Sequence, residues 1–255
     1  MSPSGVVRVE RPCPGVVELV IDRPPLNVLD DQCQRELAAA LRPLHDEDTL
    51  LAVVVRGADD VFSVGADVKE LAATTDPDPW GGVELAAHWT RSLETLPCLT
   101  IAAIRGHCLG GGLEIALCTD VRIATPEARL GFPEVRLGLL PGMGGTARLP
   151  RLVGTSWATR MVMTGEPISA QLGREIGLVT EVATDPRGAA LTLADSLRKA
   201  GPLAARLAKS LVAQPADEGA LRAERLAWKC AWATADHREA LAAFLAHRPA
   251  HFTGR

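Results

Sequence analysis

Residues 101–124 read IAAIRGHCLGGGLEIALCTDVRIA, and they place three consecutive glycines, Gly110–Gly112, just before an apolar run that contains a single acid, Glu114. Inside a helix each glycine costs roughly 1 kcal/mol relative to alanine, so this is a poor start for a packed helix. A lone glutamate among leucine, isoleucine and alanine is also unfavourable if it is buried with its charge. The stretch therefore indicates a helix that begins beside a ligand, with bare backbone turned toward it.

The composition bounds the class of protein. The chain has 255 residues, 47% hydrophobic and 23% charged, which suits one large domain or one domain with a smaller appendage. Its net charge of -4 gives no basic footprint for nucleic acid, and no apolar run approaches the roughly 20 residues of a membrane span. The first ten residues, MSPSGVVRVE, lack the layout of a signal peptide. We expect a cytoplasmic protein whose partners include neither nucleic acid nor membrane.

Short runs rich in valine, leucine and isoleucine predict strands at 15–22, 50–57 and 99–106. Apolar residues at helical spacing predict helices at 30–44 and at about 83–96. Strands that alternate with helices indicate an α/β fold, with βαβ units in a mixed or parallel sheet covered by helices.

The strand signal nearly disappears after about residue 150. The last plausible strand is at 177–182, and the pattern is helical from Asp185 onward. We therefore expect an α/β core over residues 1–195 and a helical C-terminal region over residues 196–255. The Pro/Gly/Asp-rich segment 74–82 predicts a surface turn in preference to a mobile flap.

Cysteine and histidine do not form a pattern typical of a metal or redox site. The six cysteines include no C-x-x-C pair, and the six histidines are scattered. We expect free, buried thiols and no metal. The chain also has no tyrosine, which excludes any mechanism that needs a phenol.

Two predicted strands are each followed by a glycine-flanked turn into a helix. VFSVGADVKEL (61–71) places Gly65 before one helix, and GHCLGGGLEIA (106–116) places Gly110–Gly112 before another. Helix N-termini present unpaired N–H groups and carry a partial charge of about +0.5. Two such groups converging on one oxygen would form an oxyanion hole that glycines leave open to a carbonyl.

A second acid stands close to this arrangement in the sequence. GFPEVRLGLLPGMGG (131–145) places Glu134 on a loop after a proline, and paired carboxylates with divergent pKa values can divide general acid and general base work. Taken singly, the glycines could mark a close helix–strand contact, Glu114 a paired structural acid, and Glu134 a surface residue. A phosphate loop is disfavoured because both glycine-rich phosphate-binding patterns are absent. The combination is more specific than its parts.

Four blocks resemble the crotonase, or enoyl-CoA hydratase/isomerase, superfamily in family order: FSVGADVKEL, the stretch 101–124, ARLGFPEVRLGLLPGMGGTARLPRLVG (128–154) and EALAAFLAHRPAHF (239–252). The resemblance implies a crotonase-like (ββα)n spiral core with a helical C-terminal trimerisation region. It implies acyl-CoA substrates, no cofactor beyond their CoA moiety, and a homotrimer or a homohexamer formed as a dimer of trimers. The two N–H donors that hold the thioester enolate in this family fall on Ala66 and Gly111.

The resemblance also implies a binding region for the CoA thioester, formed by Ala66, Asp67, Val68, Lys69 and Gly111, with Pro25 and Leu26 toward the adenine. The block IDRPPLNVLDD (21–31) is slightly shorter than the family's usual form, which leaves the contacts of Pro25 and Leu26 open. Where the family often has an aromatic residue, we expect His107 to be packed and not catalytic.

The acids select among the reactions of the superfamily. Hydratases resemble this chain at both Glu114 and Glu134, whereas double-bond isomerases commonly lack the first acid. Gly142 stands where hydratases use a glycine N–H to hold water and dienoyl-CoA isomerases carry an aspartate. Members that use tyrosine are disfavoured. The resemblance thus implies syn-hydration of a 2-trans-enoyl-CoA to a 3-hydroxyacyl-CoA, with Glu114 as the base of the water and Glu134 as the proton donor at C2.

Other functions remain open. Double-bond isomerisation, or another enolate-forming reaction such as a dehydration or decarboxylation, is an alternative enzyme activity. A binding protein without turnover is disfavoured by the intact acids, and RNA binding by the absence of lysine from helix 30–44. Acyl chain length and branching, the direction of the reaction, the pathway (fatty acid oxidation or biosynthesis) and trimer versus hexamer are not determined by the sequence.

Overall fold

The computed structural model describes residues 5–74, 80–212 and 217–255, and its centre is a six-stranded sheet in the order β1-β2-β3-β4-β6-β9. Strands β2, β3, β4, β6 and β9 are parallel, and β1 pairs antiparallel with β2 at one edge. A second sheet has the order β5-β7-β8. The strands are β1 Val7–Cys13, β2 Val16–Ile21, β3 Ala52–Gly57, β4 Leu99–Ile104, β5 His107–Leu109, β6 Val121–Ala124, β7 Arg129–Gly131, β8 Ile168–Ser169 and β9 Glu181–Val182.

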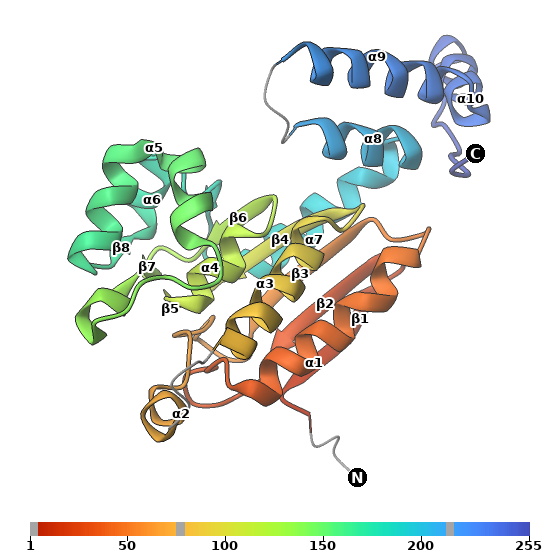
Figure 1. Cartoon of the computed structure of the whole chain (residues 1–255). Helices are drawn as coiled ribbons and strands as arrows, with labels where there is room; N and C mark the ends of the chain where they lie inside the picture. Colours follow the sequence, from red (N-terminus) through yellow and green to blue (C-terminus); the bar gives the residue numbers. More distant parts are fainter. Residues whose placement is uncertain (1–4, 75–79, 213–216) are drawn as a thin grey trace.

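Helices cover both faces of the large sheet and continue beyond it (Figure 1). The α-helices are α1 Asp31–Leu41, α2 Val68–Ala73, α3 Trp80–Glu94, α4 Gly111–Leu117, α5 Gly145–Thr164, α6 Ala170–Glu175, α7 Pro186–Ser196, α8 Pro202–Val212, α9 Glu218–Trp232 and α10 Ala235–Leu245. The described residues also form the short 3-10 helices η1 Arg42–Asp46, η2 Pro133–Leu137 and η3 Leu197–Lys199. No helix in these ranges is both long enough and apolar enough to cross a bilayer.

The period-2 alternation of the strands sorts their side chains onto two cores. Val17, Leu19 and Ile21 of β2 join the larger core, together with side chains of α1 and α3 that include the fully buried Trp89. Val16 belongs to the smaller core, which α7 covers with Ala190 and Ala194. Helices α1 and α7 therefore lie on opposite faces of the sheet.

The C-terminal helices α8, α9 and α10 lie beyond the end of the sheet (Figure 1). Helix α8 is joined to the core by Lys209, whose ammonium group donates to the Cys98 carbonyl at 2.6 Å and to Asp120 at 2.7 Å. Helix α7, which ends at Ser196, still packs on the sheet. The separation of residues 1–195 from 196–255 as domains stays a prediction.

The structure confirms the three predicted strands at 15–22, 50–57 and 99–106 and the helix at 30–44, whose N-cap is Asp30. The predicted strand 177–182 is wrong over most of its length, since only its last two residues pair in the sheet. The predicted turn 74–82 is wrong at its end, because α3 already begins at Trp80; residues 75–79 lie outside the described chain.

All six cysteines are free, as expected, but they are not all buried. Cys33, Cys98, Cys108 and Cys118 are buried, Cys13 is half-buried and Cys230 is exposed on α9. The exposed thiol belongs to α9, which packs on α8. Its exposure follows from the position of the C-terminal helices.

A buried arginine holds the segment that follows α4. Arg122 of β6 is only 4% exposed, and its guanidinium donates to the carbonyls of Leu178 and Thr119 at 2.7 and 2.6 Å. A third, longer contact of 3.4 Å reaches the Ala116 carbonyl in α4. The C-terminal end of α4 is thereby fixed relative to the large sheet.

Replacement of Arg122 by methionine is expected to lower the free energy of unfolding by about 2–6 kcal/mol, because two buried carbonyls lose their donor at about 1–3 kcal/mol each. Urea denaturation followed by circular dichroism measures this loss. The control is Arg35→Met, which removes an exposed i,i+4 ion pair with Asp31 and should change stability by less than about 1 kcal/mol. Equal effects of the two variants would contradict the assignment.

Candidate active site

The segment after β3 pairs with β5, and this pairing creates the centre of the site. The Ser63 amide donates to the His107 carbonyl at 3.0 Å, and the Leu109 amide donates to the Ser63 carbonyl at 2.9 Å. The chain therefore brings Gly65 against Gly111 at the start of α4. A Cβ on Gly65, whose φ is +88°, would lie 2.7 Å from the Gly111 nitrogen. Only glycine allows this approach without displacing the backbone.

Two backbone amides are left available at this contact. In residues 5–74 and 80–212, neither the Ala66 nor the Gly111 amide donates to a protein acceptor, whereas the intervening Gly110 amide bonds the Gly131 carbonyl at 2.9 Å. Ala66 lies just before α2, and Gly111 is the first residue of α4. The predicted pair of donors thus lies on two chain segments in direct contact.

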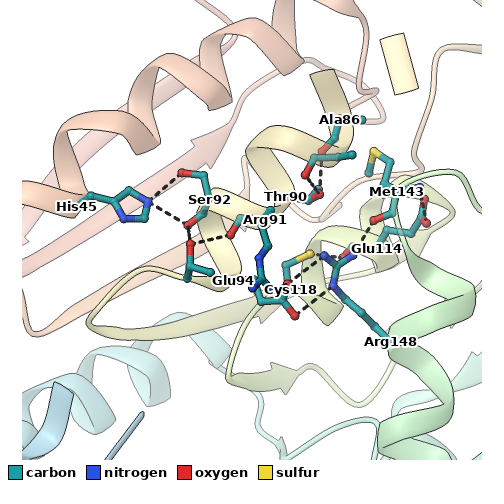
Figure 2. Close-up of polar contacts among 12 residues, drawn as sticks. His45, Ala86, Thr90, Arg91, Ser92, Glu94, Glu114, Cys118, Met143 and Arg148 are labelled. Atoms are coloured by element: carbon teal, nitrogen blue, oxygen red, sulfur yellow. Dashed lines mark hydrogen bonds and ion pairs between the residues drawn. The ribbon is translucent and has the colours of Figure 1, made fainter. Parts of the chain in front are cut away.

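Glu114 lies one turn into α4 and is 2% exposed. Its Oε1 accepts a hydrogen bond from the Met143 amide at 2.8 Å (Figure 2). It also accepts one from the Gly145 amide at 2.7 Å. Burial raises the pKa of Glu114 above its ordinary value, while the amides of Gly145, Met143 and Gly142 and the charge of Arg148 act in the opposite direction. The costly buried acid of the sequence is therefore compensated by backbone donors.

Glu134 lies on the 3-10 helix η2 and approaches the same glycine run. A Cβ on Gly110 would lie 3.2 Å from its Oε1. Its Oε2 is buried and has no hydrogen-bond partner among the described residues. Burial raises the pKa of Glu134 to about 7, its own backbone amide opposes the rise, and the charge of Glu114 adds to it. Near neutral pH this carboxyl group can both donate and accept a proton.

Apolar groups lie beside Gly111 and on the helix that follows Ala66. A Cβ on Gly111 would lie 3.0 Å from a methyl group of Leu29 and 3.2 Å from the terminal methyl of Met143. On α2, which follows Ala66, Val68 and Leu71 are exposed. A ligand with an apolar part next to a polarised carbonyl fits these surroundings.

The other residues predicted to bind substrate lie near the same segment, with different roles in the fold. Leu26 accepts a hydrogen bond from the Val64 amide through its carbonyl at 3.2 Å, which places the exposed Pro25–Leu26 turn beside the strand end that leads to Ala66. Asp67 is the N-cap of α2 and accepts from the Lys69 amide at 2.8 Å. Lys69 is exposed.

Sequence reasoning missed part of the site and misjudged one residue. It assigned Gly142 but neither the Met143 and Gly145 amides nor Arg148, although the glycine-rich PGMGG segment is the signal for such backbone donors.

The expectation that His107 is packed is wrong. Its side chain is exposed, because it alternates with the buried Cys108 on the short strand β5. The described residues contain no cluster of three or more His, Cys, Asp or Glu that could hold a metal ion.

Comparison with known proteins identifies relatives over nearly the whole chain. The family model described as enoyl-CoA hydratase/isomerase matches residues 13–255. The chain is 36% identical to the enoyl-CoA isomerase/hydratase fer4 of Mycosarcoma maydis, covering 94% of this chain and 93% of that protein. It is 37% identical to the probable enoyl-CoA hydratase echA8 of Mycobacterium tuberculosis, covering 93% and 94%.

Solved structures agree with these relatives. The enoyl-CoA hydratase structure from Bacillus anthracis superposes with a TM-score of 0.94 at 35% identity, covering 98% of this chain and all of that one. The structure of DspI from Pseudomonas aeruginosa gives a TM-score of 0.92 at 33% identity, covering 99% of this chain and all of that one. The expected crotonase-like α/β fold with a helical C-terminal region is confirmed.

The two carboxyl groups provide a direct test of the site's electrostatics. Replacing Glu114 by glutamine should lower the pKa of Glu134 from about 7, because the charge of Glu114 helps to raise it. A 13C NMR titration of protein labelled at the glutamate carboxyl groups measures the change, and Glu166→Gln, at an exposed position, is the control. A Glu134 pKa near 4.5 in the unmodified protein, or one that Glu114→Gln does not change, would contradict the arrangement.

Proposed function

Because this chain belongs to the enoyl-CoA hydratase/isomerase family, we propose that it is an enoyl-CoA hydratase, which adds water syn across a 2-trans-enoyl-CoA to give a 3-hydroxyacyl-CoA. The observation that carries the proposal is the pair of carboxyl groups beside two unpaired amides. Glu114 is held by backbone donors, whereas Glu134 has a buried oxygen without a partner in the described chain and a pKa of about 7. Hydration needs both a base and an acid.

The amides of Ala66 and Gly111 bind the thioester oxygen of the substrate. As water adds to C3, negative charge moves through C2 to this oxygen, and the two N–H groups stabilise the enolate that forms. Both donors are fixed before the reaction by the backbone pairing of residues 63 and 107–109, so little reorganisation is needed. Loss of one donor from such a site costs about 10²–10³ in rate.

Glu114 is the base that activates the water. Its Oε1 is occupied by the Met143 and Gly145 amides, which orients the carboxylate, and the Gly142 amide faces the same group and helps to hold the water. A proton passes from the water to Glu114 as the oxygen forms its bond to C3. The C2=C3 double bond becomes a single bond in this step.

Glu134 supplies the proton to C2. A pKa of about 7 leaves a substantial protonated fraction near neutral pH, which a carboxyl group with an ordinary pKa would not have. After addition Glu114 carries the proton of the water and Glu134 is ionised. A proton returns from Glu114 to Glu134 through solvent before the next cycle, which balances the reaction.

The CoA moiety binds along the start of α2. Asp67, Val68 and Lys69 follow the Ala66 amide, and the exposed Lys69 can approach a phosphate group. Pro25 and Leu26 lie beside the same segment and are proposed to contact the adenine end. Family members act on CoA substrates without an additional cofactor.

Double-bond isomerisation is the second candidate, supported by the properties of Glu134. A carboxyl group with a pKa of about 7 can take a proton from one carbon of an enoyl chain and return it to another, with the enolate held by the same two amides. A relative that is 36% identical is named an isomerase/hydratase. Assays with 2-enoyl-CoA and 3-enoyl-CoA thioesters, with identification of the products, separate the two reactions.

Assembly and location are proposed with the function. Exposed apolar side chains on the C-terminal helices (Leu221, Leu226, Trp228, Trp232, Leu241, Phe244 and Leu245) suit a homotrimer or homohexamer in which residues 196–255 pack between subunits. We propose a cytoplasmic enzyme of fatty acid metabolism with an acyl-CoA as its small-molecule partner. Sedimentation analysis measures the oligomeric state.

Replacement of either carboxyl group by its amide tests the reaction. Glu114→Gln and Glu134→Gln should each lower the hydration rate of crotonyl-CoA by about 10²–10⁴-fold, because general acid–base groups contribute that much. Formation of 3-hydroxybutyryl-CoA is measured by chromatography, with Glu166→Gln as the surface control. Near-normal turnover by either variant would overturn the roles of the carboxyl groups.

The glycine contact tests the oxyanion hole separately. Gly65→Ala should reduce kcat by about 10²–10³-fold, because the new methyl group would lie against the Gly111 amide. Gly154→Ala is the matched control, since Gly154 has a similar φ of +74° but nothing within 4 Å of an added Cβ. A similar loss in both variants would indicate backbone strain and not blockage of the donor.

A further inference from the structure

Arg148 of α5 connects two parts of the molecule behind Glu114. Its Nη1 donates to the Met143 carbonyl at 2.6 Å, and its Nη2 donates to Glu94 Oε2 at 3.1 Å (Figure 2). Glu94 is the last residue of α3, and the same carboxylate accepts from Arg91 at 3.0 Å. Arg148 thus joins the turn before α5 to the end of α3.

The contact with Met143 acts on the peptide group between Met143 and Gly144, which follows directly on the peptide group whose N–H donates to the proposed base. The Met143 amide donates to Glu114, while the Met143 carbonyl accepts from Arg148. The guanidinium also packs against Gly144, where an added Cβ would lie 2.2 Å from Nη1. The turn that supplies donors to Glu114 is therefore held from both sides.

The second partner fixes the arginine itself. The side chains of Arg148 and Glu94 are 16% and 30% exposed, so the pair is partly shielded from solvent, and two hydrogen bonds from the guanidinium to one carboxylate restrict its orientation. Helix α3 is anchored in the large core by Trp89 and Leu93. The ion pair thereby connects the turn to the rigid part of the fold.

We propose that Arg148 is a positioning residue for the hydration reaction, which rests on the function proposed above, and that Glu94 anchors it. Arg148 does not touch the reacting atoms. It holds the Met143 carbonyl so that the turn presents the Met143 and Gly145 amides to the Glu114 carboxylate, and it places a positive charge near that carboxylate. It therefore determines both the orientation and the protonation of the base.

The charged and titratable groups around Glu114 lie on four elements. Arg148 of α5 lowers the pKa of Glu114. The charge of Glu114 raises the pKa of Glu134 on η2. The charges of Glu114 and of Glu94 on α3 also raise the pKa of Cys118 on α4. Among these groups Arg148 is the cation, so loss of its charge should raise the pKa of Glu114. The acidic limb of the pH–rate profile should then move to higher pH.

Variants of Arg148 separate its geometric role from its charge. Arg148→Met should lower kcat for crotonyl-CoA by about 10- to 100-fold, as expected when a group supporting a catalytic residue is lost. KM should change little, and the acidic limb of the pH–rate profile should move to higher pH. Arg148→Lys should keep the acidic limb near its original pH, because the charge is retained. Its kcat should still fall, because an ammonium group cannot reproduce the two-sided contact of the guanidinium.

Arg91→Met is the matched control. Arg91 is 70% exposed and pairs with the same Glu94 carboxylate, but Met143 is not among its contacts in the described chain. Its kcat and pH profile should remain those of the unmodified protein. The proposal is overturned if Arg148→Met leaves both kcat and the acidic limb unchanged, or if Arg91→Met changes them equally. If Arg148→Met does not fold, an unchanged kcat in Arg148→Lys overturns the proposal.

A measurement without substrate keeps the two proposals apart. A 13C NMR titration should show a higher Glu114 pKa in Arg148→Met than in the unmodified protein, whatever reaction the site performs. If the unmodified protein does not hydrate enoyl-CoA, the proposed function is contradicted, but the higher Glu114 pKa in Arg148→Met is still expected. If the unmodified protein is an active hydratase and the Glu114 pKa does not change in Arg148→Met, only the proposed role of Arg148 is contradicted.

Discussion

The contact between Gly65 and Gly111 is the constraint on which the site depends. It requires that the segment after β3 pair with β5, that no side chain intervene, and that α4 start where the strand ends. The glycine run that is unfavourable for a helix is the condition for this approach, since a Cβ on Gly112 would also collide with the Ser63 carbonyl. The two amides and the start of the buried helix are consequences of one backbone pairing.

Two chemically identical side chains differ because their surroundings differ. Glu114 accepts hydrogen bonds from the amides of Met143 and Gly145, while Glu134 leaves one buried oxygen without a partner in the described residues. Burial raises both pKa values, but only for Glu114 do several backbone donors and a cation oppose it. The division of labour we propose needs no difference in residue type, only a difference in hydrogen bonding.

Local patterns in the sequence predicted the features that depend on local chemistry. The valine-rich strands, the helix at 30–44 and the helix that follows the glycine run all follow from spacing and backbone conformation. Strands β5, β7 and β8 have two or three residues each, too few to form a recognisable alternation, and the resulting exposure of His107 was therefore not predicted. The Glu94–Arg148 pair joins positions 54 residues apart, and no periodicity signals such a contact.

The proposed oxyanion donors are main-chain groups, and this has a consequence for how such a fold can diversify. A substitution at Ala66 changes a side chain but leaves its N–H in place, so the capacity to hold an enolate is insensitive to much sequence drift. The carboxyl groups, by contrast, are single side chains on separate segments, one on α4 and one on η2. New reactions can therefore arise when the acidic side chains are exchanged while the two backbone amides that hold the enolate stay the same.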